Sequence, residues 1–128
     1  MIEEDKPAFR VFSLNSISNN ANGETYEFLN QGGAGMLIAY RKEGSMSGNH
    51  YHKGEVDAKN PEQLILQSGK VEISATSVLS GRYVKEMALA PCRVEVYPNY
   101  RHSLLAITDI VFIELNSLDE HIRDTHYE

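Results

Sequence analysis

The sequence predicts an all-β fold, an antiparallel sandwich or small barrel, from three observations. Turn-forming residues recur at short intervals along the chain. The segments between them favour strand, and several alternate apolar and polar side chains with a period of two. No window carries the long apolar stripe at three- and four-residue spacing that an amphipathic helix needs. Short strands separated by frequent turns are typical of antiparallel sandwiches and barrels.

The first half of the chain carries five expected strands, each a short segment between turn residues: 9–14, 24–29, 35–42, 49–53 and 62–67. The first is aromatic, the second places Tyr26 and Phe28 on one face, and the third is densely apolar. The fourth alternates His, Tyr and His, and the fifth follows Pro61 and ends at a Ser-Gly turn. Two segments are expected to be loops, 15–23 because it is rich in Asn and Ser, and 54–61 because it is polar.

The second half carries five more expected strands: 71–77, 83–89, 93–97, 102–107 and 109–115. In the first of these, apolar and polar side chains alternate at every position, and the dipeptide Pro98-Asn99 ends the third. The tail, 117–128, is expected to form one helical turn. We therefore expect residues 1–128 to form a single domain with a core over about 24–115, a short N-terminal arm and an acidic C-terminal tail.

Composition restricts the partners and the location. Apolar residues make up 41% and charged residues 23%, which is ordinary for a folded domain. Asp and Glu number 18 against 12 Lys and Arg, and no basic cluster is present, so we expect neither nucleic acid nor an anionic membrane as partner. The single cysteine, Cys92, excludes an intrachain disulfide and a multi-thiolate metal site. No signal peptide and no apolar run of about 20 residues is visible, so a cytoplasmic location is expected.

Three histidines carry the main chemical information. His50 and His52 lie two residues apart in an expected strand, so both imidazoles face the same side. His102 follows the turn at Pro98, and a neighbouring strand can return it to that face. Imidazoles that converge with one carboxylate form a ligand set for a divalent transition metal. The candidate carboxylates are those that follow the pair in sequence: Glu55, Asp57 and Glu62.

The spacing around these residues resembles the first motif of the cupin superfamily, Gly-x5-His-x-His-x3–4-Glu-x6-Gly. Five residues separate Gly44 from His50, and six separate Glu62 from Gly69. Nine residues lie between His52 and Glu62, where the family has three or four. We interpret this difference as an insertion of about five or six residues, which a loop tolerates at little entropic cost.

The insertion leaves two carboxylates as rivals for one ligand position. Asp57 keeps the family's usual spacing from His52. Glu62 begins an expected strand and keeps the family's distance to Gly69. For these two reasons Glu62 is the favoured ligand, and Asp57 stays as the alternative.

The segment Pro-Asn-Tyr-Arg-His, 98–102, resembles the centre of the second cupin motif, Pro-x-Gly-x-x-His, with one residue missing. Asn99 can supply the positive-φ turn that glycine gives in the family. Cys92 and Ala106 stand where the family has Gly and Asn. The resemblance covers 35–115 and implies an antiparallel double-sheet jelly-roll barrel. It also implies a bound Zn, Mn, Fe or Ni ion with four ligands: His50, His52, Glu62 and His102.

Two groups of sugar-pathway cupins are similar in local sequence. The segments 48–53 and 62–69 resemble sugar-pathway cupins, such as the C-terminal cupin domain of capsular-polysaccharide-assembling proteins and the WxcM-like sugar-nucleotide 3,4-ketoisomerases. The tail segment 119–124 is similar to the ending of the second group. The resemblance implies a sugar or sugar-nucleotide ligand and a homodimer, for which exposed strand edges give a physical reason. His121 and His126 lie in the acidic tail, where we expect them to be solvated.

The expected function is an isomerase or epimerase that acts on a carbohydrate or sugar nucleotide by proton transfer beside a carbonyl, which the metal polarises. In a metal-free site, His50 or His52 would be the general base and Tyr100 the general acid. The residues leave other functions open: a non-catalytic sugar-binding or sensor cupin, an iron-dependent dioxygenase, and a structural domain whose histidines are only hydrogen-bonded.

Overall fold

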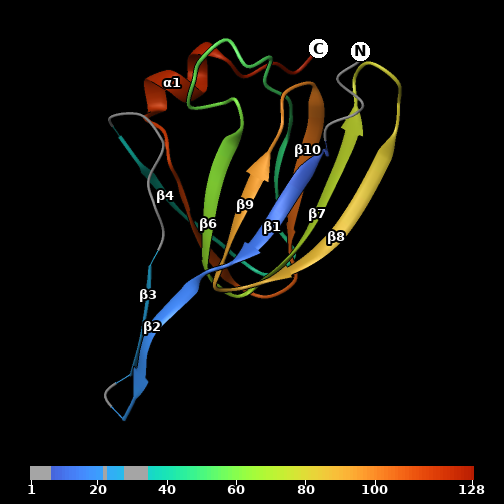
Figure 1. Cartoon of the computed structure of the whole chain (residues 1–128). Coiled ribbons are helices and arrows are strands. Elements are labelled where there is room, and N and C mark those ends of the chain that lie inside the picture. Colours follow the sequence, from blue (N-terminus) through green and yellow to red (C-terminus); the bar gives the residue numbers. More distant parts are fainter. Residues whose placement is uncertain (1–6, 22, 28–34) are drawn as a thin grey trace.

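Two antiparallel sheets face each other and form a jelly-roll barrel (Figure 1), which confirms the predicted fold class. The structure is a computed structural model, and it describes residues 7–21, 23–27 and 35–128. The larger sheet has, in spatial order, five strands: β1 (Phe9–Ser13), β9 (Cys92–Val96), β6 (Glu62–Ser68), β11 (Ile110–Glu114) and β4 (Leu37–Arg41). The smaller sheet has four: β5 (Met46–His50), β10 (Tyr100–Ala106), β7 (Lys70–Ser77) and β8 (Tyr83–Leu89).

Two segments differ from the sequence expectations. The predicted loop over 15–23 is wrong, because β2 (Asn15–Asn20) and β3 (Gly23–Glu27) pair as an antiparallel two-stranded sheet. Asn and Ser disfavour strands, but this preference depends on context, and cross-strand pairing overrides it here. The predicted strand 49–53 is shorter than expected, since β5 ends at His50. Positions 28 and 29 of the predicted strand 24–29 lie outside the described residues.

The core lies between the two sheets. Alternate residues of β7, β9 and β10 face inward and are buried. They pack with inward side chains of β6 and β11 in one cluster, which includes Leu64, Ile73, Val94 and Phe112. Each such side chain contributes roughly 1.5–3 kcal/mol to folding through burial. Cys92 belongs to this cluster, and burial raises the pKa of its thiol.

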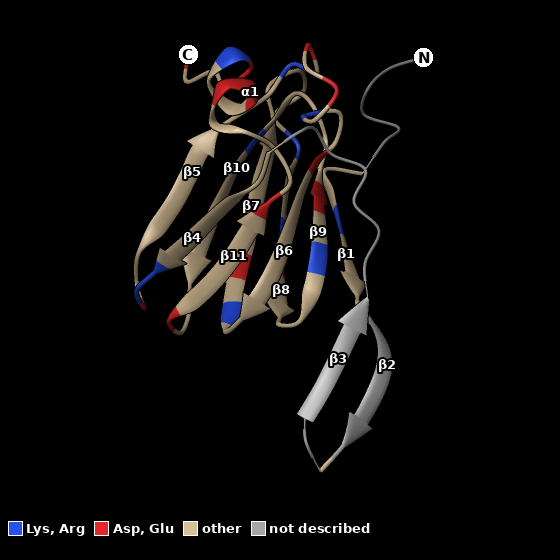
Figure 2. Cartoon of the chain, turned by 90° about the vertical axis from the view of Figure 1, so that its left-hand side faces the viewer, with Lys and Arg blue, Asp and Glu red and all other residues tan. Residues whose placement is uncertain are grey.

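One end of the barrel collects the segments that build the site. The loop over 51–61 and the helix α1 (Leu118–Arg123) both lie there, at the top of Figures 1 and 2. The helix begins at the N-cap Ser117, whose hydroxyl accepts from the backbone N–H of Glu120 while the Glu120 carboxylate accepts from the backbone N–H of Ser117. This capping box explains why a helical turn starts at this point of the tail. Within the described part of the chain, no helix is long and apolar enough to cross a membrane.

Gly69, the closing glycine of the first motif, joins β6 to β7 and packs against the backbone of Asp109. Its φ is +92°, and an added Cβ would lie 2.2 Å from the carbonyl oxygen of Asp109. Gly44 has a similar φ of +87°, but no described atom lies within 4 Å of its Cβ position. We expect Gly44→Ala to lower the free energy of unfolding by about 1–2 kcal/mol and Gly69→Ala by about 3 kcal/mol or more, measured by urea denaturation. Equal losses would contradict this interpretation.

Candidate functional site

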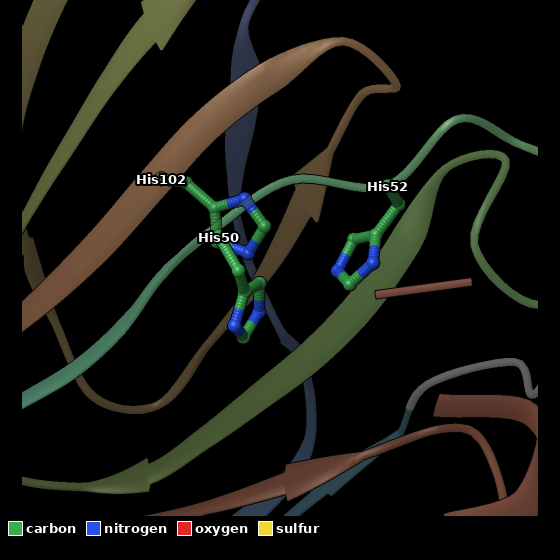
Figure 3. Close-up of side chains that lie close together, drawn as sticks. All are labelled: His50, His52 and His102. Atoms are coloured by element: carbon green, nitrogen blue, oxygen red, sulfur yellow. The ribbon is translucent and has the colours of Figure 1, made fainter. Parts of the chain in front are cut away.

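The rings of three histidines, His50, His52 and His102, lie close together (Figure 3). They lie at the end of the barrel where α1 is, since His121 of this helix is near His50 and His52. His50 is the last residue of β5 and pairs across strands with His102 of β10. His52 follows, and its carbonyl accepts from the backbone N–H of Asn99 at 2.8 Å. The ring centroids lie 4.9–5.1 Å apart in all three pairs. The structure therefore brings together the three histidines that the sequence analysis selected.

Glu62 reaches the same place from the opposite sheet. It is the first residue of β6, and its two carboxylate oxygens lie 3.3 Å from His52 Nε2 and 3.2 Å from His102 Nε2. Asp57 is exposed in the preceding loop, and Glu55 is exposed beside the C-terminal segment. Of the three carboxylates considered from the sequence, Glu62 is the one that meets the histidines.

Backbone carbonyls fix how two of these rings point. The Nδ1–H of His52 donates to the carbonyl of Asp124 at 2.6 Å, and that of His102 to the carbonyl of Tyr100 at 3.1 Å. In a neutral ring this leaves the lone pair on Nε2, so both lone pairs face the Glu62 carboxylate. His52 Nε2 is buried and has no hydrogen-bond partner among the described residues.

This arrangement fits a divalent transition metal. A neutral Nε2 that faces a carboxylate at this distance needs a cation between them, either a proton or a metal ion. Histidines that bind metals typically donate their other ring N–H to a carbonyl or carboxylate, as His52 and His102 do here. The three histidines also offer ring nitrogens within 4.8 Å of one another.

The electrostatics of the site favour a neutral His50 imidazole and an ionised Glu62 carboxylate. Burial, together with the neighbouring His102 and His52, lowers the pKa of His50 from 6.5 to about 3. Burial acts to raise the pKa of Glu62, but its contacts with His102 and His52 and the charge of Lys59 hold that pKa well below its usual range. Imidazole lone pairs and one carboxylate are donors that suit Zn, Mn, Fe and Ni.

Lys59 is a site residue that the sequence analysis missed. It lies in the loop before β6, and its side chain is 0% exposed. The ammonium group forms a short ion pair with the Glu62 carboxylate, donates to Asn116 Oδ1 at 3.1 Å and lies 2.9 Å from His121 Nδ1. A lysine in a polar loop is ordinarily exposed, so no local sequence feature marks this residue.

A cavity of about 120 Å³ opens beside these groups. The described residues that line it come from both sheets and from α1: Arg41, Ser47, Gly48, His50, Glu62, Leu64, His102, Leu104, Phe112, Glu114 and His121. The expectation that His121 is solvated is wrong, because α1 places its ring 5.4 Å from that of His50. Burial and the Lys59 charge lower the pKa of His121 to about 4, whereas burial and the Glu62 charge raise that of Glu114 to about 7.

Tyr100, the predicted general acid, is not among the described residues that line this cavity. Its side chain is 1% exposed and packs with Ala8 and Ala75 in a second core cluster. The phenol oxygen lies 3.4 Å from Arg82 Nη1. The residue contributes to the site through its backbone carbonyl, which accepts from His102.

Asp124 ties the C-terminal segment to the site. Its buried carboxylate accepts from four successive backbone N–H groups, at 2.8–3.3 Å, in the loop before β6: those of Lys53, Gly54, Glu55 and Val56. Burial acts to raise the pKa of Asp124, but these hydrogen bonds and one from His126 lower it below its usual value. Because its carbonyl also orients His52, one residue fixes both the loop and a histidine of the site.

Comparison with known proteins finds similarity in structure. No protein-family model and no curated protein matches the chain. The dTDP-4-dehydrorhamnose 3,5-epimerase of Sulfolobus tokodaii is 16% identical with a TM-score of 0.65, over 84% of this chain and 69% of the epimerase. QdtA, a sugar 3,4-ketoisomerase of Thermoanaerobacterium thermosaccharolyticum solved with TDP, is 14% identical with a TM-score of 0.72, over 94% of this chain and 88% of QdtA.

A third similar structure is a longer protein. The capsular polysaccharide assembling protein CapF of Staphylococcus aureus is 21% identical with a TM-score of 0.60. The similarity covers 91% of this chain but 32% of CapF. These structures confirm the predicted fold, which all three of them share with this chain. This chain has the fold of the sugar-pathway cupins.

Proposed function

We propose that this protein binds a divalent transition metal at His50, His52, Glu62 and His102 and isomerises or epimerises a sugar nucleotide by proton transfer beside a carbonyl. The observation that carries the metal is that the Nε2 atoms of His52 and His102 both face the Glu62 carboxylate, while a backbone carbonyl orients each ring. The similar folds support the substrate class, because they include a dTDP-sugar epimerase and a TDP-bound 3,4-ketoisomerase.

The cavity provides the groups that such a reaction needs. A bound metal ion would polarise the carbonyl oxygen of the substrate. Glu114 and His121 line the cavity next to the four ligands, so their position suits them to exchange a proton with the adjacent carbon. Arg41 adds a cationic group to the lining, which suits a phosphate or another anionic part of the ligand. From its volume of about 120 Å³, we expect the cavity to take the reacting part of a sugar nucleotide and to leave the rest outside.

A metal-free isomerase is the second candidate, and the Lys59 ion pair favours it. The ammonium already compensates the buried charge of Glu62. The centre can therefore persist without a metal. In that case a histidine of the centre would act as general base, and Glu114, which lines the cavity as Tyr100 does not, would donate the proton.

The proposal includes a homodimer. β4 is an edge strand of the larger sheet, and its side chains Ile38 and Tyr40 are 61% and 72% exposed. An apolar edge of this kind favours pairing with another chain. Light scattering in solution tests this, and the mass of a single chain would contradict it.

A QdtA variant has been solved with TDP-4-keto-6-deoxyglucose, which serves here as the probe. We expect the metal-loaded protein to exchange deuterium from D2O into this compound at a carbon beside the carbonyl, measured by NMR. Glu114→Gln is expected to slow this exchange by about 10²–10⁴-fold with the metal content unchanged, since it removes a proton carrier at the cavity. The matched control is Glu43→Gln, because Glu43 is exposed.

The outcomes separate the candidate functions. Exchange that stops on chelation supports the metal enzyme, and exchange that persists unchanged supports the metal-free isomerase. Binding of the sugar nucleotide with no exchange under either condition would contradict both and indicate a binding or sensor cupin.

A further inference from the structure

Lys59 is enclosed by polar groups from several elements. Its ammonium pairs with Glu62 of β6 and lies 3.6 Å from the Glu114 carboxylate of β11. It also contacts Asn116, which follows β11, and His121 of α1. A buried charge is tolerated only when it is paired and hydrogen-bonded, and these contacts provide that pairing.

Lys59 contacts three residues that line the cavity without lining it itself. Glu62, Glu114 and His121 line the cavity, whereas Lys59 is not among the described lining residues. These three lining groups offer ligand atoms within 4.8 Å of one another, a spacing that suits a cation. The Lys59 ammonium contacts all three. The site thus has two adjacent cation positions, one among the histidines and one that the ammonium fills.

Glu62 belongs to both positions. Its Oε2 pairs with Lys59 and lies 3.3 Å from His52 Nε2, while its Oε1 faces His102 Nε2 at 3.2 Å. The Glu62 carboxylate is therefore shared between the Lys59 ammonium and the histidine centre. Two cations that share one carboxylate repel each other, and this repulsion is strong in a buried site.

We propose that Lys59 is a positioning residue: a fixed second cation that holds Glu62 and weakens divalent-metal binding at the three histidines. This inference rests on the proposed function, because it concerns the metal site described there. This role gives a reason for a buried lysine in the polar loop at this end of the barrel. The ammonium stabilises the site without metal and keeps the affinity for metal lower than the donor set alone would give.

The test is a Zn²⁺ titration of the full chain against a competing chelator, comparing the wild type with Lys59→Met. Methionine keeps the length of the side chain and removes the charge. We expect Lys59→Met to bind Zn²⁺ at least about tenfold more tightly, because the repulsion is removed and both Glu62 oxygens become available. The matched control is Lys53→Met, which removes an exposed lysine from the same loop and should leave the affinity unchanged.

Two further measurements distinguish this role from simple packing. Zn²⁺ should raise the Tm of Lys59→Met more than that of the wild type, since the metal then replaces the lost ammonium. The visible spectrum of the Co²⁺-loaded protein should change in Lys59→Met and not in Lys53→Met, because the coordination by Glu62 changes. If Lys59→Met does not fold, Lys59→Gln is the second variant, because glutamine keeps a hydrogen-bond donor. A variant that folds only when metal is present supports the proposal.

The remaining outcomes of the Zn²⁺ titration separate the role of Lys59 from the proposed metal site. A wild type that binds Zn²⁺ with an affinity equal to or higher than that of both variants overturns the role of Lys59 and leaves the proposed metal site intact. Zn²⁺ binding by the variants but not by the wild type supports the role of Lys59 and removes the resident metal from the proposed function. If no form binds Zn²⁺, or if neither variant folds with or without metal, the proposal about Lys59 is wrong.

Discussion

Replacing His52 with alanine is expected to abolish stoichiometric metal binding while the barrel stays folded. His52 Nε2 is buried, lacks a hydrogen-bond partner among the described residues and faces Glu62. The substitution removes one ligand nitrogen and leaves the other two histidines. Substituting a residue that only hydrogen-bonds a ligand typically lowers metal affinity about 10–100-fold, so the loss of a ligand itself should exceed this. Elemental analysis by mass spectrometry of untagged protein, purified without chelator, measures this, and circular dichroism checks the fold.

The control for this prediction is His126→Ala. That imidazole lies in the C-terminal segment, where it contacts Asp124, and it does not belong to the histidine cluster. Full metal occupancy in His52→Ala would show that the cluster is not the metal site. The identity of the metal in the wild type also separates the candidate reactions, since iron directs attention to dioxygen chemistry and zinc or manganese to carbonyl polarisation.

Replacing Asp124 with alanine is expected to cause the largest loss of stability of any single carboxylate change at the site. The substitution leaves four backbone N–H groups of the loop without their acceptor and removes a charged group that is 0% exposed. Hydrogen bonds to charged groups contribute about 1.5–3 kcal/mol each, and water can replace some of these. We therefore expect a loss of about 3 kcal/mol, which for a chain of this length corresponds to a fall in Tm of roughly 10 °C.

Asp119→Ala provides the matched control for Asp124→Ala. Asp119 is also a C-terminal aspartate, but its carboxylate is 78% exposed and pairs only with Arg123 at the surface among the described residues. Its removal should cost less than about 1 kcal/mol. Thermal unfolding measures both variants. Equal changes in Tm would mean that the Asp124 carboxylate does not hold the loop in place.

Much of the barrel follows from local patterns. Alternation over 71–77 predicts β7, whose residues do alternate between core and surface. The spacing of Glu62 from Gly69 favours this carboxylate over Asp57, and the structure places Glu62 beside the histidines. The first prediction succeeds because a strand turns alternate side chains to opposite faces, so spacing decides which side chains share a face. The second rests on the resemblance to the cupin motif, whose spacing Glu62 keeps toward Gly69.

The sequence by itself predicted the fold class, most of the strands and the three histidines that meet, and it favoured Glu62 over Asp57. Only the tertiary structure decided which other groups surround them. Lys59 contacts His121 across 62 positions of the chain, and Asp124 reaches the loop at Lys53 across 71. No local pattern encodes such contacts, because a charged side chain in a loop looks the same in sequence whether it is solvated or buried. Its environment depends on where the barrel brings the loop before β6 against the C-terminal segment, and that follows from the packing of the whole fold.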